Sequence, residues 1–233
     1  QLIFYCLEET MELDFTVLLL MLVPLVFAIT IHEAAHGYMA YWLGDNTAKA
    51  QGRLSLSPIR HIDPIGTIAV PLALFVLSTL TDSGLFLFGW AKPVPFDPRN
   101  FKNPRKDIAW TAAAGPLSNL IQAFVWAIVL VISSKFSNGQ MNEPTMLLGL
   151  MKMAYFGVMV NVFLMVLNLL PIPPLDGGKI AMMLLPYNIS QHLYKIEPYG
   201  IWILLGLLYL NVLPLGAISQ AVIQLILSIV GIF

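Results

Sequence analysis

Long runs without a charged side chain constrain this chain more than any other feature. Three such runs cover residues 15–31, 108–134 and 153–175, and two more cover residues 64–81 and 198–233. A helix needs about 20 mostly apolar residues to cross a bilayer. Only 11% of the residues are charged, whereas about 25% are charged in a typical soluble domain. We therefore expect an all-α membrane protein that has the lipid bilayer as its surroundings.

The lengths of these runs predict about six transmembrane segments, since residues 198–233 are long enough for two crossings. The first helix is expected to continue through residue 31 to Leu43, and a later helix is expected to begin near Met146. Residues 11–233 are expected to form one domain. Residues 1–10 are expected to be a non-native or disordered extension, with Met11 as the natural start.

Basic residues indicate how the chain is oriented in the membrane. The positive-inside rule assigns loops rich in Lys and Arg to the cytoplasmic side. We therefore expect a multi-pass protein of the cell membrane whose functional site opens towards the cytoplasm. The net charge of −1 gives no reason to expect nucleic acid as a partner. The basic residues gather in three groups: Lys49, Arg53 and Arg60; Arg99, Lys102, Arg105 and Lys106; Lys179 and Lys195.

This orientation leaves one segment that must return through the membrane without room for a helix. If residues 64–81 cross outward, residues 82–98 must come back, and three prolines in this stretch oppose a helix. Extended backbone at membrane depth is tolerated where protein or a wet cavity surrounds it. We expect residues 84–96 to form a short membrane-embedded strand or re-entrant hairpin. Equally, residues 64–81 could themselves be re-entrant.

The sequence His32-Glu33-Ala34-Ala35-His36 carries the strongest chemical signal. Histidines four positions apart share one face of a helix, so both rings can reach one Zn²⁺ at about 2.0–2.1 Å. Glu33 lies beside that face, where it can act as general base on a water molecule. Each ionisable side chain inside a membrane segment costs ~2.5 kcal/mol or more. This cost argues against a purely structural role for His32, Glu33 and His36.

A catalytic zinc site usually has three protein ligands, so one more ligand is expected. His61, His192 and the acidic residues near the cytoplasmic helix ends are the candidates. Asp176 is favoured, because the helix before it ends on the same side as the helix that carries His32. A turn aspartate before glycines would be the structural alternative. We expect His61 to hydrogen-bond in its loop near Asp63 and His192 to be solvated.

Taken together, the segments HEAAH (32–36) and LNLLPIPPLDGG (167–178) resemble the site-2 protease family of intramembrane zinc metalloproteases. Three further segments are similar to the small members of this family without PDZ or CBS domains: GRLSLSPIRHIDPIGT (52–67), FGWAKPVPFDPRN (88–100) and AGPLSN (114–119).

The resemblance implies zinc bound by His32, His36 and Asp176, with Glu33 activating water. It also implies that Asn168 holds substrate or stabilises an oxyanion, although an interhelical hydrogen bond is an equal alternative for Asn in a membrane. The implied reaction hydrolyses peptide bonds in or near the transmembrane segment of a single-pass membrane protein, in some cases after trimming by an upstream protease. Asn119 is expected to pack its helix against the zinc-binding helices.

Two other classes of function compete with this interpretation. Histidines and carboxylates inside a membrane also mark the pathways of metal-ion transporters. The runs 108–134 and 198–233, however, contain no His, Asp or Glu that would continue such a path. An inactive family member acting as a binding protein is the second alternative, and the intact Glu33 argues against it.

Overall fold

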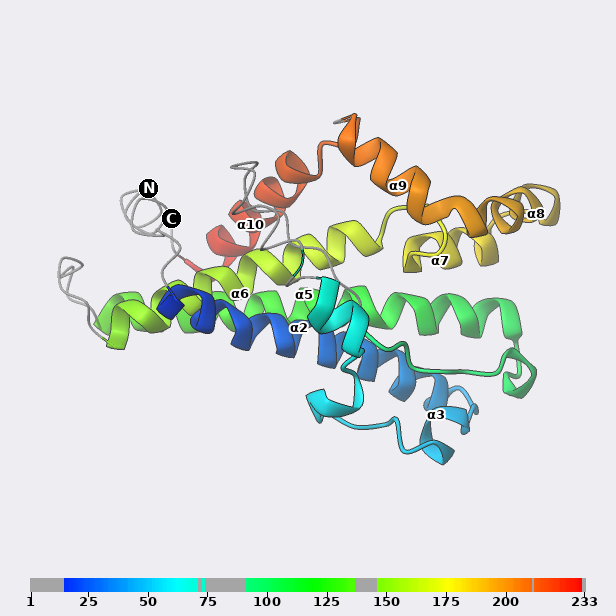
Figure 1. Cartoon of the computed structure of the whole chain (residues 1–233), viewed down its shortest axis with the longest axis horizontal. Coiled ribbons are helices and arrows are strands. Elements are labelled where there is room, and N and C mark those ends of the chain that lie inside the picture. The colour runs from blue at the N-terminus through cyan, green and yellow to red at the C-terminus, as the bar shows by residue number, and fades with distance from the viewer. Residues whose placement is uncertain (1–14, 71–72, 74–90, 137–145, 211, 232–233) are drawn as a thin grey trace.

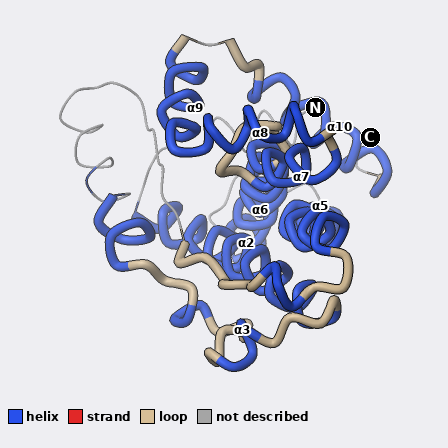
Figure 2. Tube along the Cα trace, turned by 90° about the vertical axis from the view of Figure 1, so that its right-hand side faces the viewer, coloured by secondary structure: helices blue, strands red, loops and turns tan. Residues whose placement is uncertain are grey.

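The computed structural model describes residues 15–70, 73, 91–136, 146–210 and 212–231. Within these ranges the protein is helical and contains no strand, as Figure 2 shows. The predicted all-α class is therefore confirmed for the described part of the chain. The predicted strand or hairpin at 84–96 falls mostly outside it: residues 84–90 are not described, and residues 91–96 have no regular secondary structure.

Among the described residues, three helices are long and apolar enough to cross a membrane: α2 (Phe15–Trp42), α5 (Pro104–Phe136) and α6 (Met146–Asn168). Their positions agree with the predictions: the first helix continues through residue 31 and ends at Trp42, one residue before the predicted Leu43, and α6 begins at Met146. Figure 1 shows the three helices running lengthwise side by side, and each of them contacts the other two. They form the body of the molecule.

Small side chains allow these helices to approach closely. Ala123 and Ala127 of α5 and Val158 and Val162 of α6 are completely buried in one apolar cluster. Gly157 of α6 lies so close to α5 that a Cβ atom there would be 2.5 Å from the ring of Trp126. Small residues at helix contacts replace the hydrophobic driving force, which is weak between helices surrounded by lipid.

Short helical elements and loops join the long helices on the side where α2 ends and α5 begins. They include α3 (Thr47–Ala50), η1 (Pro58–Arg60), the π-helical segment η2 (Pro64–Ala69) and η3 (Pro98–Asn100). The predicted segment 64–81 thus begins as helix at Pro64, but most of it lies outside the described residues.

After α6 the chain forms a series of shorter helices: α7 (Asp176–Leu184), α8 (Tyr187–Ile196), η4 (Glu197–Tyr199), α9 (Gly200–Tyr209) and α10 (Leu215–Val230). The 10 residues of α9 rise about 15 Å and the 16 residues of α10 about 24 Å. Both are shorter than the ~30 Å hydrocarbon core. Two full crossings within 198–233 are therefore not confirmed.

Candidate metal centre

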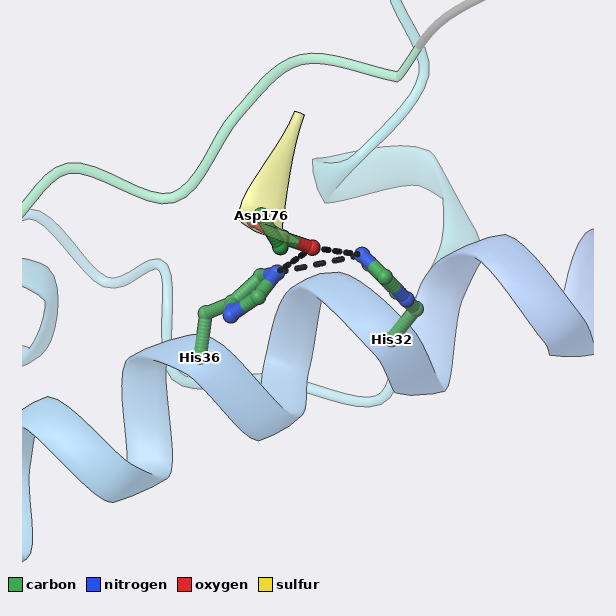
Figure 3. A group of neighbouring side chains, drawn as sticks. All are labelled: His32, His36 and Asp176. Atoms are coloured by element: carbon green, nitrogen blue, oxygen red, sulfur yellow. Dashed lines mark hydrogen bonds and ion pairs between the residues drawn. The ribbon is translucent and has the colours of Figure 1, made fainter. Parts of the chain in front are cut away.

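His32 and His36 lie one turn apart on α2 and point to the same side of the helix (Figure 3). The Nε2 atoms of the two rings are 3.1 Å apart. His32 is buried, with 8% of its surface exposed, and it is a polar residue in a largely apolar helix. The predicted common face of the two histidines is confirmed.

Asp176 joins these histidines from another part of the chain. Helix α6 ends at Asn168, the proline-containing turn 169–175 follows, and Asp176 is the first residue of α7. Its Oδ2 atom lies 3.2 Å from Nε2 of His32 and 3.3 Å from Nε2 of His36 (Figure 3). The close turn requires glycine, because a Cβ atom at Gly177 would be 2.3 Å from the carbonyl oxygen of Leu169.

The spacing of these three atoms fits a tetrahedral metal ion. Two ligands of a tetrahedral Zn²⁺, each at about 2.0–2.1 Å, are separated by roughly 3.3 Å. The observed separations are 3.1, 3.2 and 3.3 Å. Asp176 Oδ2 is buried, and no donor outside the two histidine rings reaches it from the described residues. The group therefore has the donor types and the spacing of a zinc site.

The second nitrogen of each histidine explains why the Nε2 atoms are free to bind a metal. Nδ1 of His36 lies 2.7 Å from the carbonyl oxygen of Thr111. A carbonyl oxygen can only accept, so this Nδ1 carries the proton and Nε2 presents a lone pair. Nδ1 of His32 lies 2.6 Å from Oδ1 of Asn119, which gives the same arrangement. Such outer contacts orient histidine ligands in metal sites.

Asn119 is itself held by the neighbouring helices. Its amide nitrogen donates to the carbonyl oxygen of Ala28 at 3.2 Å and to Oδ1 of Asn161 at 2.9 Å. Asn161 in turn donates to the carbonyl oxygen of Gly157 at 2.8 Å. Both asparagines are completely buried. These hydrogen bonds join α2, α5 and α6. They also orient the Asn119 amide so that its Oδ1 accepts from Nδ1 of His32.

Gly115 lets α5 approach the two histidines. A Cβ atom at this position would lie 2.5 Å from Cε1 and Nε2 of His36 and 2.6 Å from Cε1 of His32. Real Cβ atoms do not make contacts this short, so any larger residue would displace the rings. The segment AGPLSN thus supplies both the space for the rings, at Gly115, and the acceptor for His32, at Asn119.

Glu33 lies next to the metal-binding group and contacts a loop from the far side of the site. Its Oε2 atom accepts a hydrogen bond of 3.0 Å from the backbone N–H of Val94. Pro93 and Pro95 flank this residue and have no N–H, so Val94 provides the one backbone donor of the triplet. The contact fixes one carboxylate oxygen of Glu33 and leaves Oε1 for a water molecule.

The loop that carries Val94 is anchored at both ends. On one side Arg53 donates from Nη2 to the carbonyl oxygens of Lys92 and Pro93. On the other side the buried carboxylate of Asp45 accepts from the backbone N–H of Asp97 and from the side chain of Asn100. Burial alone would raise the pKa of Asp45, but these bonds and those from Thr47 outweigh it and lower the pKa.

A cavity of about 170 Å³ opens at this group. It is large enough for water and for a short length of extended backbone, and its lining combines the metal-binding group with apolar loop residues. Asn168 lies in the wall, and its Nδ2 donates to the carbonyl oxygen of Leu164 in its own helix at 3.0 Å. Besides His32, His36 and Asp176, the lining is formed by Glu33, Pro93, Val94, Phe96, Thr111, Ala112, Asn168, Pro174, Leu175 and Lys179.

The other two histidines do not join the site. His61 is buried and forms the expected loop hydrogen bond, but its partner is the carbonyl oxygen of Ser55 at 2.7 Å and not Asp63. The Asp63 carboxylate is used by the backbone of η2 instead. His192 is exposed on α8 and bonds to the carbonyl oxygen of Asn188.

Asn119 lies at a helix contact, as predicted, but its bond to His32 and the contacts of Thr111, Asn161 and Val94 were not predicted. In the sequence, Asn161 is marked by an amide within a charge-free run, and Asn119 also by its place in the segment AGPLSN. A backbone carbonyl or N–H leaves no signal in the residue type, so the contacts of Thr111 and Val94 could be found only in the structure.

Comparison with known proteins agrees with this geometry. Residues 131–213, which include Asp176, match Peptidase family M50. YwhC of Bacillus subtilis is 39% identical over 197 residues, which cover 84% of this chain and 82% of that protein. Rip2 of Mycolicibacterium smegmatis is 25% identical, covering 69% of this chain and 55% of that protein. Both relatives carry the name "Putative zinc metalloprotease". No solved structure matches the chain.

The match to YwhC extends over most of both proteins, and the family match covers the segment that provides the aspartate. The structure independently brings two histidines of α2, a helix fit to cross a membrane, and this aspartate of α7 within the reach of one metal ion. The chain therefore belongs to peptidase family M50, the site-2 protease family of membrane zinc metalloproteases.

Proposed function

We propose that this protein is an intramembrane-cleaving zinc endopeptidase, which hydrolyses peptide bonds in or near the transmembrane segments of other membrane proteins. The observation that carries the proposal is the group His32, His36 and Asp176, whose ligand atoms all lie within 4.8 Å of one another. His32 lies 10 residues before the end of α2 at Trp42, about 15 Å along the helix. A site at this depth favours substrates that are themselves in the bilayer.

His32, His36 and Asp176 would hold the zinc ion. Zinc bound there supplies a Lewis acid that polarises the scissile carbonyl and makes water a nucleophile at neutral pH. Glu33 takes the proton from the attacking water through the carboxylate oxygen that Val94 leaves free. The same carboxylate then delivers the proton to the nitrogen of the leaving amine, which completes the hydrolysis.

Asn168 is a candidate for holding the substrate. One of its amide hydrogens is bound to the Leu164 carbonyl, which leaves the second for a substrate carbonyl oxygen at the cavity wall. The bond within its own helix supports a structural role equally well. The cleavage rates of Asn168→Ala and Asn168→Asp should therefore be compared with those of variants of His32, His36 and Asp176.

The proposed function also includes the position of the protein in the membrane and the class of its substrate. Residues 11–233 form one domain with about six membrane segments in the cell membrane, and the site opens to the cytoplasm, where the basic loops lie. The substrate is a single-pass membrane protein, which an upstream protease trims in some cases. The three long apolar helices support this setting.

Two variants test the proposal. Asp176→Ala should lose the single zinc per chain, because two histidines alone hold the ion poorly. Glu33→Gln should keep zinc and fold but lose cleavage of a membrane substrate, because the amide cannot accept a proton. Retained cleavage in Glu33→Gln, or unchanged zinc and activity in Asp176→Ala, would refute the assignment.

A metal transporter would instead keep its metal flux in Glu33→Gln, and an inactive binding protein would show no cleavage in the wild type. The inactive Glu33→Gln protein would also trap natural substrates for identification by mass spectrometry.

A further inference from the structure

The two oxygens of the Asp176 carboxylate face different groups. Oδ2 points to the histidine rings, at 3.2 and 3.3 Å from their Nε2 atoms. Oδ1 lies 3.4 Å from Nζ of Lys179. Among the described residues that line the cavity this is the one Lys or Arg, and 35% of its side-chain surface is exposed.

The backbone places Lys179 beside Asp176 in a defined way. The two residues are three positions apart in α7 and therefore lie on one side of its first turn. The intervening glycines lock this turn against the preceding segment. A Cβ atom at Gly177 would be 2.3 Å from the Leu169 carbonyl oxygen, and one at Gly178 would be 2.3 Å from the nitrogen of Pro173. The lysine thus extends from a fixed backbone, and its ammonium group reaches the outer oxygen of the carboxylate.

A carboxylate can bind a metal through one oxygen or through both. If Asp176 used both oxygens, the second would occupy the coordination position that a catalytic zinc keeps for water. We propose that Lys179 is a positioning residue that holds Oδ1 of Asp176 and restricts this ligand to Oδ2. The inference rests on the proposed zinc site and adds to it a residue that keeps the water position open.

This role differs from two simpler roles of a lysine in such a place. A lysine that only stabilises α7 would affect folding and leave the properties of the bound metal unchanged. A lysine that binds the substrate would affect KM and likewise leave the metal unchanged. Only the proposed role alters how the metal is coordinated in the absence of substrate.

Cobalt(II) in place of zinc gives the decisive measurement, because four-coordinate Co²⁺ absorbs visible light more strongly than five- or six-coordinate Co²⁺. Full-length protein in detergent is loaded with Co²⁺ as wild type, Lys179→Met, Lys179→Gln and Lys179→Arg. Lys195→Met, which removes an exposed lysine of α8, is the matched control. Zinc affinity is measured in parallel by competition with a chelator, and helical content by circular dichroism.

We expect the two neutral variants, Lys179→Met and Lys179→Gln, to keep their helical content and to show weaker Co²⁺ absorption. They should bind zinc about 10–100-fold more weakly, as is typical when an outer contact of a metal ligand is lost. Lys179→Arg should restore both properties, and Lys195→Met should match the wild type. Unchanged Co²⁺ absorption and unchanged zinc affinity in the neutral variants would overturn the inference. This holds even if these variants cleave more slowly, because the lysine would then act on the substrate and not on the metal ligand. A wild-type protein that binds neither metal would refute the proposed zinc site itself, which is a separate outcome.

Discussion

Oδ1 of Asn119 lies 2.6 Å from Nδ1 of His32, and the same asparagine donates through its nitrogen to Ala28 and Asn161. The Ala28 carbonyl can only accept, so the orientation of the amide is determined and its oxygen must face the histidine. A buried amide between α2, α5 and α6 therefore sets which nitrogen of His32 is available to a metal.

Replacing Asn119 by Leu should weaken zinc binding by about 10–100-fold, since His32 loses the acceptor that orients its ring. Gln122→Leu is a suitable control, because this residue is buried in the same helix and its amide has no hydrogen-bond partner among the described residues. Its zinc affinity should match the wild type. Chelator competition on both purified proteins checks the prediction, and equal affinities in the two variants would contradict it.

Gly115→Ala should remove bound zinc although no ligand is changed. The new Cβ atom would lie 2.5 Å from Cε1 and Nε2 of His36, so the rings would have to leave their positions. Gly149→Ala in α6 is the control, because its Cβ atom would make an ordinary contact of 3.6 Å with Leu20. Metal analysis of the two proteins is the measurement. A Gly115→Ala protein with a full complement of zinc would show that α5 is more distant from the site than the structure has it.

Val94→Pro deletes the backbone donor to Glu33 and should lower kcat. A hydrogen bond to a charged group contributes about 1.5–3 kcal/mol, which corresponds to roughly 10–100-fold in rate. Zinc content should not change, because the hydrogen bond that is lost goes to Glu33 and not to His32, His36 or Asp176. Val94→Ala keeps the N–H and shortens the side chain, so it controls for lost packing. If both variants cleave at the same rate, the N–H of Val94 does not position the base.

Asp45→Asn should destabilise the loop above the site. Both oxygens of Asp45 accept hydrogen bonds, so an amide nitrogen in place of one oxygen would face a donor, at a cost of about 1–3 kcal/mol. Asp63→Asn is the control, because its carboxylate accepts the backbone N–H groups of Ile65 and Gly66 with one oxygen, Oδ1, and an amide oxygen can accept the same bonds. Thermal unfolding in detergent at neutral pH should separate the two variants.

The effect of Asp45 should also depend on pH. Its pKa in the folded protein is lowered, so its contribution to stability is present above the ordinary value of 3.8 and is lost as pH falls through the lower folded value. The difference in unfolding temperature between wild type and Asp45→Asn should therefore shrink only in acid below about pH 4. A difference that already disappears between pH 5 and 7 would rule out an ionised Asp45 as the cause.

The sequence by itself determined the parts of this protein that depend on local periodicity and hydropathy. Charge-free runs located α2, α5 and α6, because a segment in lipid must be apolar and must satisfy its own backbone. The spacing of His32 and His36 placed both rings on one face, because a helix repeats every 3.6 residues. Asp176 was predicted as the third ligand from its place at the end of such a run, together with the orientation of the helices, and the structure brings it beside the two histidines.

Only the tertiary structure decided what surrounds these groups. Asn119 meets His32 across 87 positions, Thr111 meets His36 across 75, and Val94 meets Glu33 across 61. Two of these contacts use a backbone carbonyl or N–H, which every non-proline residue possesses, so residue types cannot single them out. Which of them faces the site depends on the rotation and depth at which α2, α5 and the loop at 91–97 pack. Those quantities are set by shape complementarity between side chains far apart in the sequence, such as the contact of Gly115 with the two histidine rings.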